Sequence, residues 1–139
     1  MKQKAGGRVL VCDAVHDCLL EGLSSLGYEV DYQPNARLSE VDQWIANLSG
    51  IVINSRTLLP KERLEKATSL RFIARLGSGM EIIDVPYATS CGIACLSAPE
   101  GNAFSVAEQA LAAMLSWMNN LTVADRYLRK GSWERERFR

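Results

Sequence analysis

The chain has 139 residues, of which 47% are hydrophobic and 23% are charged, and its 16 basic residues balance its 16 acidic ones. This length and composition predict one globular domain of ordinary size. A net charge of zero argues against a basic surface for nucleic acid. The most apolar run, residues 110–118, is far shorter than the ~20 residues that cross a bilayer, so we expect no membrane anchor.

The cysteine and histidine content argues against a metal site. Cys12, Cys18, Cys91 and Cys95 form no C-x-x-C pair, and His16 is the only histidine. Because a structural zinc site needs four closely spaced ligands, we expect no bound metal. Reduced thiols and the lack of a signal-peptide pattern at the N-terminus are typical of a cytoplasmic protein.

The first 97 residues alternate short strand-like runs with helical patterns. Strands are predicted at Arg8–Cys12, Tyr28–Gln33, Gly50–Asn54, Arg71–Arg75 and Ile93–Leu96. Strands that alternate with helices predict βαβ units. We therefore expect an α/β domain over residues 1–97, built on a flavodoxin-like parallel five-stranded sheet with helices on both faces.

Capping residues predict where the helices between these strands begin and end. Gly27 ends the first helix, and Ser39 is expected to cap the second. Pro60 fits the first turn of a third helix, which ends near Thr68, and Pro86 opens a fourth.

Residues 98–139 predict a linker, one long helix and a tail. Ser105 and Glu108 have the spacing of a capping box, no helix breaker is recognised before Lys130, and Gly131 ends the pattern. Residues 107–118 are apolar on nearly every side of such a helix, so the helix needs protein contacts all round. Because one sheet covers only one side, we expect a second copy of the chain, or a further piece of protein, on the rest.

Several residues near the predicted strand ends are candidates for ligand binding. The turn Gly77-Ser78-Gly79 follows the fourth strand directly; its successive amides can hold an anion, or it merely reverses the chain. Asn102 is either a helix-entry residue or a side chain that faces a ligand. Asp13 is interpreted as a carboxylate at a helix entry or as part of an acidic site, and His16 is expected to be solvated.

One pattern resembles a known family. The segments Arg71–Asp84, Gly92-Ile93, Ala98–Asn102 and Ser105–Glu108 are similar to those of the D-isomer-specific 2-hydroxyacid dehydrogenases, in particular the phosphoglycerate dehydrogenase-like members, and the resemblance extends over residues 8–139. It implies an NAD-dependent oxidoreductase that acts on the CH–OH group of a D-2-hydroxy acid and, in reverse, reduces the 2-keto acid. It also implies that this chain is only the N-terminal, substrate-binding portion.

The resemblance further implies the roles of individual residues. The backbone amides of Ser78 and Gly79 would hold the substrate carboxylate, and Asn102 would line the same pocket. Val106 and Glu108 would lie near the nicotinamide of NAD, and the 105–130 helix would form a homodimer interface. In the family the catalytic histidine, arginine and acidic residue belong to a following Rossmann domain. No G-x-G-x-x-G motif follows a strand here, so we expect no catalytic residue in this chain and no activity from it alone.

Asn54 stands where phosphoglycerate-using members carry an arginine suited to a phosphate, which argues against 3-phosphoglycerate among the candidate substrates. Two other functions are compatible with the sequence: a free-standing flavodoxin-like binding or regulatory module, and a subunit that has lost catalysis. A receiver module would need an aspartate after the third strand and a lysine after the fifth, where this chain has Asn54 and Ser97.

Overall fold

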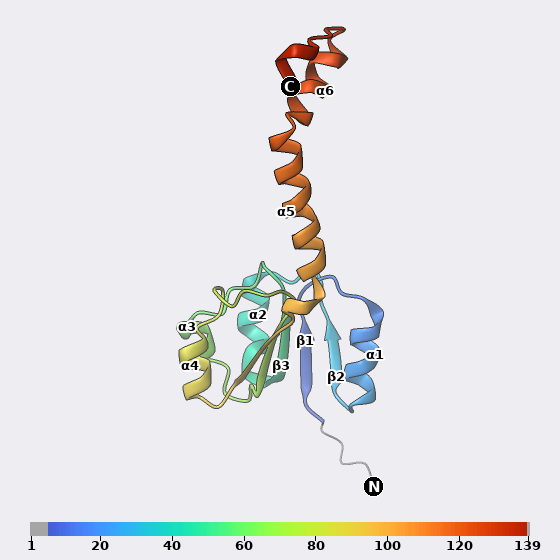
Figure 1. The fold of residues 1–139 in the computed structure, drawn as a ribbon. Helices are drawn as coiled ribbons and strands as arrows, with labels where there is room; N and C mark the ends of the chain where they lie inside the picture. The colour runs from blue at the N-terminus through green and yellow to red at the C-terminus, as the bar shows by residue number, and fades with distance from the viewer. Residues whose placement is uncertain (1–5, 139) are drawn as a thin grey trace. The chain divides into compact units, whose positions relative to one another are not determined.

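The computed structural model describes residues 6–138 and divides the chain into two compact units, Met1–Pro99 and Glu100–Arg139 (Figure 1). The first unit contains one sheet of five strands: β1 (Arg8–Val11), β2 (Glu29–Tyr32), β3 (Leu48–Ile53), β4 (Phe72–Arg75) and β5 (Ala94–Ser97). All neighbouring strands are parallel, and their order is β2-β1-β3-β4-β5. This order confirms the predicted flavodoxin-like α/β fold.

Helices cover both faces of this sheet (Figure 1). Successive strand residues point to opposite faces, so β1 contributes to two cores. Val9 and Val11 pack with Val52 against leucines of α1 (Asp17–Ser25). Leu10 belongs to the larger core on the other face, below α2 (Leu38–Trp44), α3 (Lys61–Leu64) and α4 (Val85–Ser90). Burial on both faces explains the unbroken apolar runs of the central strands.

The predicted boundaries of α2 and α3 are wrong. Ser39 does not cap α2, because the helix begins at Leu38 with Arg37 at its N-cap. The carboxylate of Glu40 accepts a hydrogen bond from the backbone N–H of Arg37 at 2.7 Å. This contact stabilises a helix start that lies before Ser39. Pro60 is the N-cap of α3 rather than part of its first turn, and α3 ends at Leu64, well before Thr68.

The prediction that Gly27 ends the first helix is confirmed. Gly27 and Gly92 follow α1 and α4 with φ values of 88° and 74°, a conformation that glycine adopts at little cost. At the start of α4, Asp84 is the N-cap, and its carboxylate accepts from the backbone N–H of Tyr87 at 3.0 Å. Pro86 was expected to open this helix, but it lies within the first turn and Val85 is the first residue.

The second unit corrects the prediction of one long helix from Ser105 to Lys130. It contains α5 (Ala103–Met118) and α6 (Leu121–Arg129), with Asn102 rather than Ser105 at the N-cap of α5. Between the helices, the side-chain amide of Asn119 donates to the carbonyl oxygen of Leu115 at 2.9 Å. Asn120 has a φ of 52°, and asparagine tolerates this left-handed conformation better than most residues.

The tail after α6 folds back on that helix. Phe138 packs edge-on against Tyr127, with ring centroids 5.6 Å apart. The Arg137 guanidinium lies 4.5 Å from the centroid of the Tyr127 ring. Gly131 follows α6 with a φ of 76° and allows this reversal. Across the described part of the chain, no helix combines the length and the apolar character needed to span a membrane.

Candidate functional site

The strand order reverses between β1 and β3, because β2 lies beside β1 whereas β4 and β5 follow β3. In open parallel sheets, ligands bind outside the carboxyl ends of the strands at such a point. The residues that follow the strands at this edge are Asp13 after β1, Asn54 after β3 and Gly77–Gly79 after β4. The structure therefore places the predicted turn next to the expected binding position.

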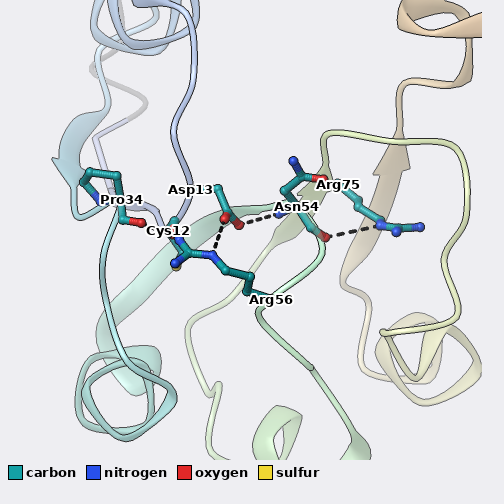
Figure 2. A network of polar contacts seen from close by, with 6 residues as sticks. All are labelled: Cys12, Asp13, Pro34, Asn54, Arg56 and Arg75. Atoms are coloured by element: carbon teal, nitrogen blue, oxygen red, sulfur yellow. Dashed lines mark hydrogen bonds and ion pairs between the residues drawn. The ribbon is translucent and has the colours of Figure 1, made fainter. Parts of the chain in front are cut away.

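Asp13 links β1 to β3 (Figure 2). Its side chain is only 9% exposed. One carboxylate oxygen accepts from the backbone N–H of Asn54 at 2.7 Å, and the other accepts from Nε of Arg56 at 2.9 Å. Asp13 is thus neither a helix-entry carboxylate nor a member of an acidic cluster. It is a buried connector at the point where the strand order reverses.

Arg56 faces the ends of β1 and β2. Besides its contact with Asp13, its Nη2 donates to the carbonyl oxygen of Cys12 at 3.0 Å and to that of Pro34. The guanidinium therefore bridges two strand ends while Asp13 balances its charge (Figure 2).

Arg75, the last residue of β4, attaches the glycine turn to β3. Its Nε donates to the carbonyl oxygen of Asn54 at 3.3 Å, and its Nη1 donates to the carbonyl oxygen of Gly79 and to the Glu81 carboxylate, the latter at 3.2 Å. The Arg75 side chain is only 11% exposed. Sequence reasoning assigned no role to Arg75, although an arginine at a strand end directly before a glycine turn was a usable signal.

The Gly77–Gly79 turn presents unused backbone donors. Within residues 6–138, the N–H groups of Ser78 and Gly79 donate no hydrogen bond, and Ser78 is exposed. A Cβ added at Gly79 would lie 2.7 Å from Nη1 of Arg75 and would also overlap the Glu81 carboxylate, whereas one added at Gly77 would meet nothing closer than 3.8 Å. A side chain at Gly79 would therefore have to displace the flexible ends of Arg75 and Glu81, whereas the backbone of Gly79 does not have a positive φ.

Cys12 and His16 lie near this edge, but their contacts indicate structural rather than catalytic roles. Burial, followed by the charge of Asp13, raises the pKa of the Cys12 thiol to about 12, so Cys12 is protonated at neutral pH and is a poor nucleophile. His16 is exposed, as expected, and its Nδ1 accepts from the backbone N–H of Cys18 at 3.2 Å as the N-cap of α1. The described residues contain no cluster of three potential metal ligands.

Three predicted site residues belong to the second unit. Asn102 is the N-cap of α5, and its carbonyl oxygen accepts from the backbone N–H of Val106 at 3.0 Å. Val106 is 58% exposed and Glu108 is also exposed. Their expected roles at a ligand stay predictions.

Comparison with known proteins identifies a family. The profile of the D-isomer specific 2-hydroxyacid dehydrogenase catalytic domain matches residues 9–130. The D-3-phosphoglycerate dehydrogenases of Archaeoglobus fulgidus and Methanocaldococcus jannaschii are each 33% identical to this chain. The matches cover 94% and 95% of this chain but only 25% of each relative. The chain thus spans about a quarter of the length of these relatives.

Solved structures share the fold. A protein from Pyrococcus horikoshii superposes with a TM-score of 0.81 at 26% identity, over 92% of this chain and 38% of its own. An NADPH-dependent glyoxylate/hydroxypyruvate reductase from Sinorhizobium meliloti superposes with a TM-score of 0.71 at 28% identity, over 94% of this chain and 40% of its own. In both cases the match leaves more than half of the other protein uncovered.

Proposed function

We propose, because the chain belongs to the D-isomer specific 2-hydroxyacid dehydrogenase family, that it forms the substrate-binding portion of an NAD-dependent oxidoreductase. In the proposed reaction, the CH–OH group of a D-2-hydroxy acid is oxidised to a keto group, and the reverse reaction reduces the 2-keto acid. When bound, NAD would supply the hydride-accepting chemistry, and a base would be needed to take the hydroxyl proton.

The role assigned to this chain is to hold the substrate by its carboxylate. The observation that carries this proposal is the pair of unused N–H groups at Ser78 and Gly79, beside the guanidinium of Arg75. Two backbone donors suit the two oxygens of a carboxylate, and hydrogen bonds to an ionised acceptor are stronger than neutral ones. A carboxylate fixed in this way orients the neighbouring C2 atom for reaction.

The fit of this chain to NAD is limited. Residues 6–138 contain no glycine-rich strand-turn-helix of the kind that holds a pyrophosphate, so we derive no step through the cofactor. Val106 and Glu108 are proposed neighbours of its nicotinamide. The one histidine of the chain caps α1 and is not placed to act as the base, so we propose that the chain alone does not turn over substrate.

We also propose that the protein is a cytoplasmic homodimer with α5 at the interface. Exposed apolar side chains follow one another along this helix: Leu111, Met114, Leu115, Trp117 and Met118. Contiguous apolar surface of this kind is uncommon on monomers, and two-fold pairing of one helix with its copy is the simplest way to cover it.

A titration with D-glycerate tests the carboxylate role. We expect the backbone amide resonances of Ser78 and Gly79 in the 139-residue protein to shift as D-glycerate is added. Glycerol, which lacks the carboxylate, is the matched control and should leave them in place. Amides that ignore D-glycerate at millimolar concentration, or respond equally to glycerol, would contradict the proposed function.

A further inference from the structure

We infer that Glu81 is a built-in competitor of the substrate: its carboxylate pairs with Arg75 beside the Gly77–Gly79 turn and is displaced when a substrate carboxylate binds there. The inference rests on the proposed function, because it concerns the same carboxylate site. Nη1 of Arg75 donates to Oε2 of Glu81 at 3.2 Å and also to the carbonyl oxygen of Gly79. A Cβ added at Gly79 would overlap the same Oε2 atom. An acidic side chain therefore already lies against the turn that is proposed to bind an acid.

The two partners of this ion pair are held with very different firmness. The Arg75 side chain is only 11% exposed and is also bound to the backbone carbonyl oxygens of Asn54 and Gly79. The Glu81 side chain is 67% exposed, and within residues 6–138 its carboxylate accepts from Arg75 alone. An ion pair with so exposed a partner contributes little to stability. The guanidinium is therefore the fixed member of the pair, and the carboxylate is the replaceable one.

The backbone on both sides of Glu81 is anchored. Met80 packs against the larger core. The backbone N–H of Leu59 donates to the carbonyl oxygen of Ile82 at 2.8 Å, and the N–H of Asp84 donates to the carbonyl oxygen of Leu59 at 3.0 Å. Displacement of the carboxylate therefore needs only a rotation of the Glu81 side chain, which exposed side chains make within picoseconds to nanoseconds.

The donors around Arg75 suit an exchange of one carboxylate for another. A guanidinium binds a carboxylate best through two parallel N–H bonds. Glu81 uses only Nη1, and Nη2 of Arg75 donates to no acceptor within residues 6–138. A substrate carboxylate that replaces Glu81 finds this unused donor together with the N–H groups of Ser78 and Gly79, and a carboxylate accepts about four hydrogen bonds.

The competition lowers the affinity of the site. While Glu81 lies against the turn, its negative charge repels an anionic substrate. The protein binds the substrate only in the fraction of molecules in which Glu81 has turned away, and the apparent affinity falls by that fraction. Glu81 thus favours acids that bind the turn and Arg75 well enough to replace it.

Glu81→Gln tests the inference, because it removes the charge and keeps the length of the side chain. With the amide shifts of Ser78 and Gly79 as readout, we expect the variant to bind D-glycerate about 5-fold more tightly than the wild-type protein, the effect of removing a like charge about 4 Å away in water. A residue that merely held Arg75 in place would give the opposite sign, a loss of affinity.

Glu65→Gln is the matched control. Glu65 follows α3 and pairs with Lys61 at 3.9 Å, and both of these side chains are more than half exposed. The control loses the same charge away from the turn and should bind D-glycerate as the wild-type protein does. A second readout is the Nε–H resonance of Arg75 in the wild-type protein, which should shift with D-glycerate and stay in place with glycerol.

The outcomes separate the two proposals. If D-glycerate shifts the Ser78 and Gly79 amides but Glu81→Gln binds it no more tightly than the wild-type protein, the inference is overturned and the proposed function stands. If D-glycerate moves these amides in neither protein, the proposed function fails and the inference fails with it. Should Glu81→Gln not fold, as judged by loss of amide dispersion, the Arg75 resonance decides: a resonance that stays in place while the amides shift overturns the inference.

Discussion

The carboxylate of Asp13 and the guanidinium of Arg56 are 2.9 Å apart, although the two residues are separated by 43 positions in the chain. The same carboxylate accepts from the backbone N–H of Asn54 at 2.7 Å. These two bonds tie β1 to the end of β3 at the point where the strand order reverses. They therefore contribute to stability and fix the backbone of Asn54 at the end of β3.

Asp13→Ala should destabilise the protein. The substitution leaves the N–H of Asn54 without its acceptor and Arg56 without its partner, which costs about 1–3 kcal/mol in free energy of unfolding. Urea unfolding measures this loss. Asp125→Ala is the control, because Asp125 pairs with Arg129 at a similar 2.8 Å but the two side chains are 58% and 76% exposed. The control should leave the midpoint unchanged; equal effects of both variants would contradict the role of Asp13.

Gly79→Ala should impair acid binding but leave the fold intact. The new methyl group would displace Arg75 and Glu81, which approach Gly79 closely through flexible side chains, and would disturb the turn that presents the two N–H groups. We expect at least about a 10-fold loss of affinity for D-glycerate, the loss of one charge-assisted bond. Gly77→Ala is the matched control, since its methyl group would make only ordinary contacts. If Gly79→Ala binds as well as Gly77→Ala, the turn is not the site.

The four cysteines should react with iodoacetamide in a definite order. Cys18 and Cys91 are exposed, whereas Cys12 is buried, and burial raises the pKa of its thiol to about 12. Burial also raises the pKa of Cys95, which is half-buried. Because the thiolate is the reactive form, peptide mass spectrometry at pH 8 should find Cys18 and Cys91 modified first and Cys12 last. In urea the four rates should converge. Modification of native Cys12 as fast as Cys18 would show that its site opens readily.

The proposed dimer should depend on the apolar surface of α5. Met114 is 58% exposed and Trp117 is 83% exposed, so both are available to a second copy of the helix. Light scattering over a dilution series should give the mass of a dimer for the wild-type protein and of a monomer for Met114→Glu, because a buried charge opposes association. Gln109→Glu adds the same charge at an exposed polar position of α5 and should be less disruptive. A wild-type protein that stays monomeric at high micromolar concentration would refute the interface.

Local signals in the sequence were sufficient for the strands and for the ends of several helices. The five predicted strands agree with β1–β5 to within two residues at each end, because apolar runs between helical segments follow from the burial of a parallel sheet on both faces. Gly27 and Gly92 mark helix ends through their own backbone freedom. The Gly77–Gly79 turn was predicted from local features as well, because its residue types and its place after a strand are visible in the sequence.

The tertiary structure decided what depends on distant partners. Asp13 looked like a helix-entry carboxylate, because nothing in its neighbourhood along the chain shows that Asn54 and Arg56 complete its hydrogen bonds. Arg75 gained its role only when parallel pairing placed the end of β3 beside β4. The sequence did not predict the break between α5 and α6 at Asn120, because asparagine only weakly disfavours a helix. The left-handed conformation of Asn120 is visible in the backbone but not in the residue pattern. Side-chain chemistry at the strand ends is set by which strands become neighbours, and that is a property of the assembled sheet.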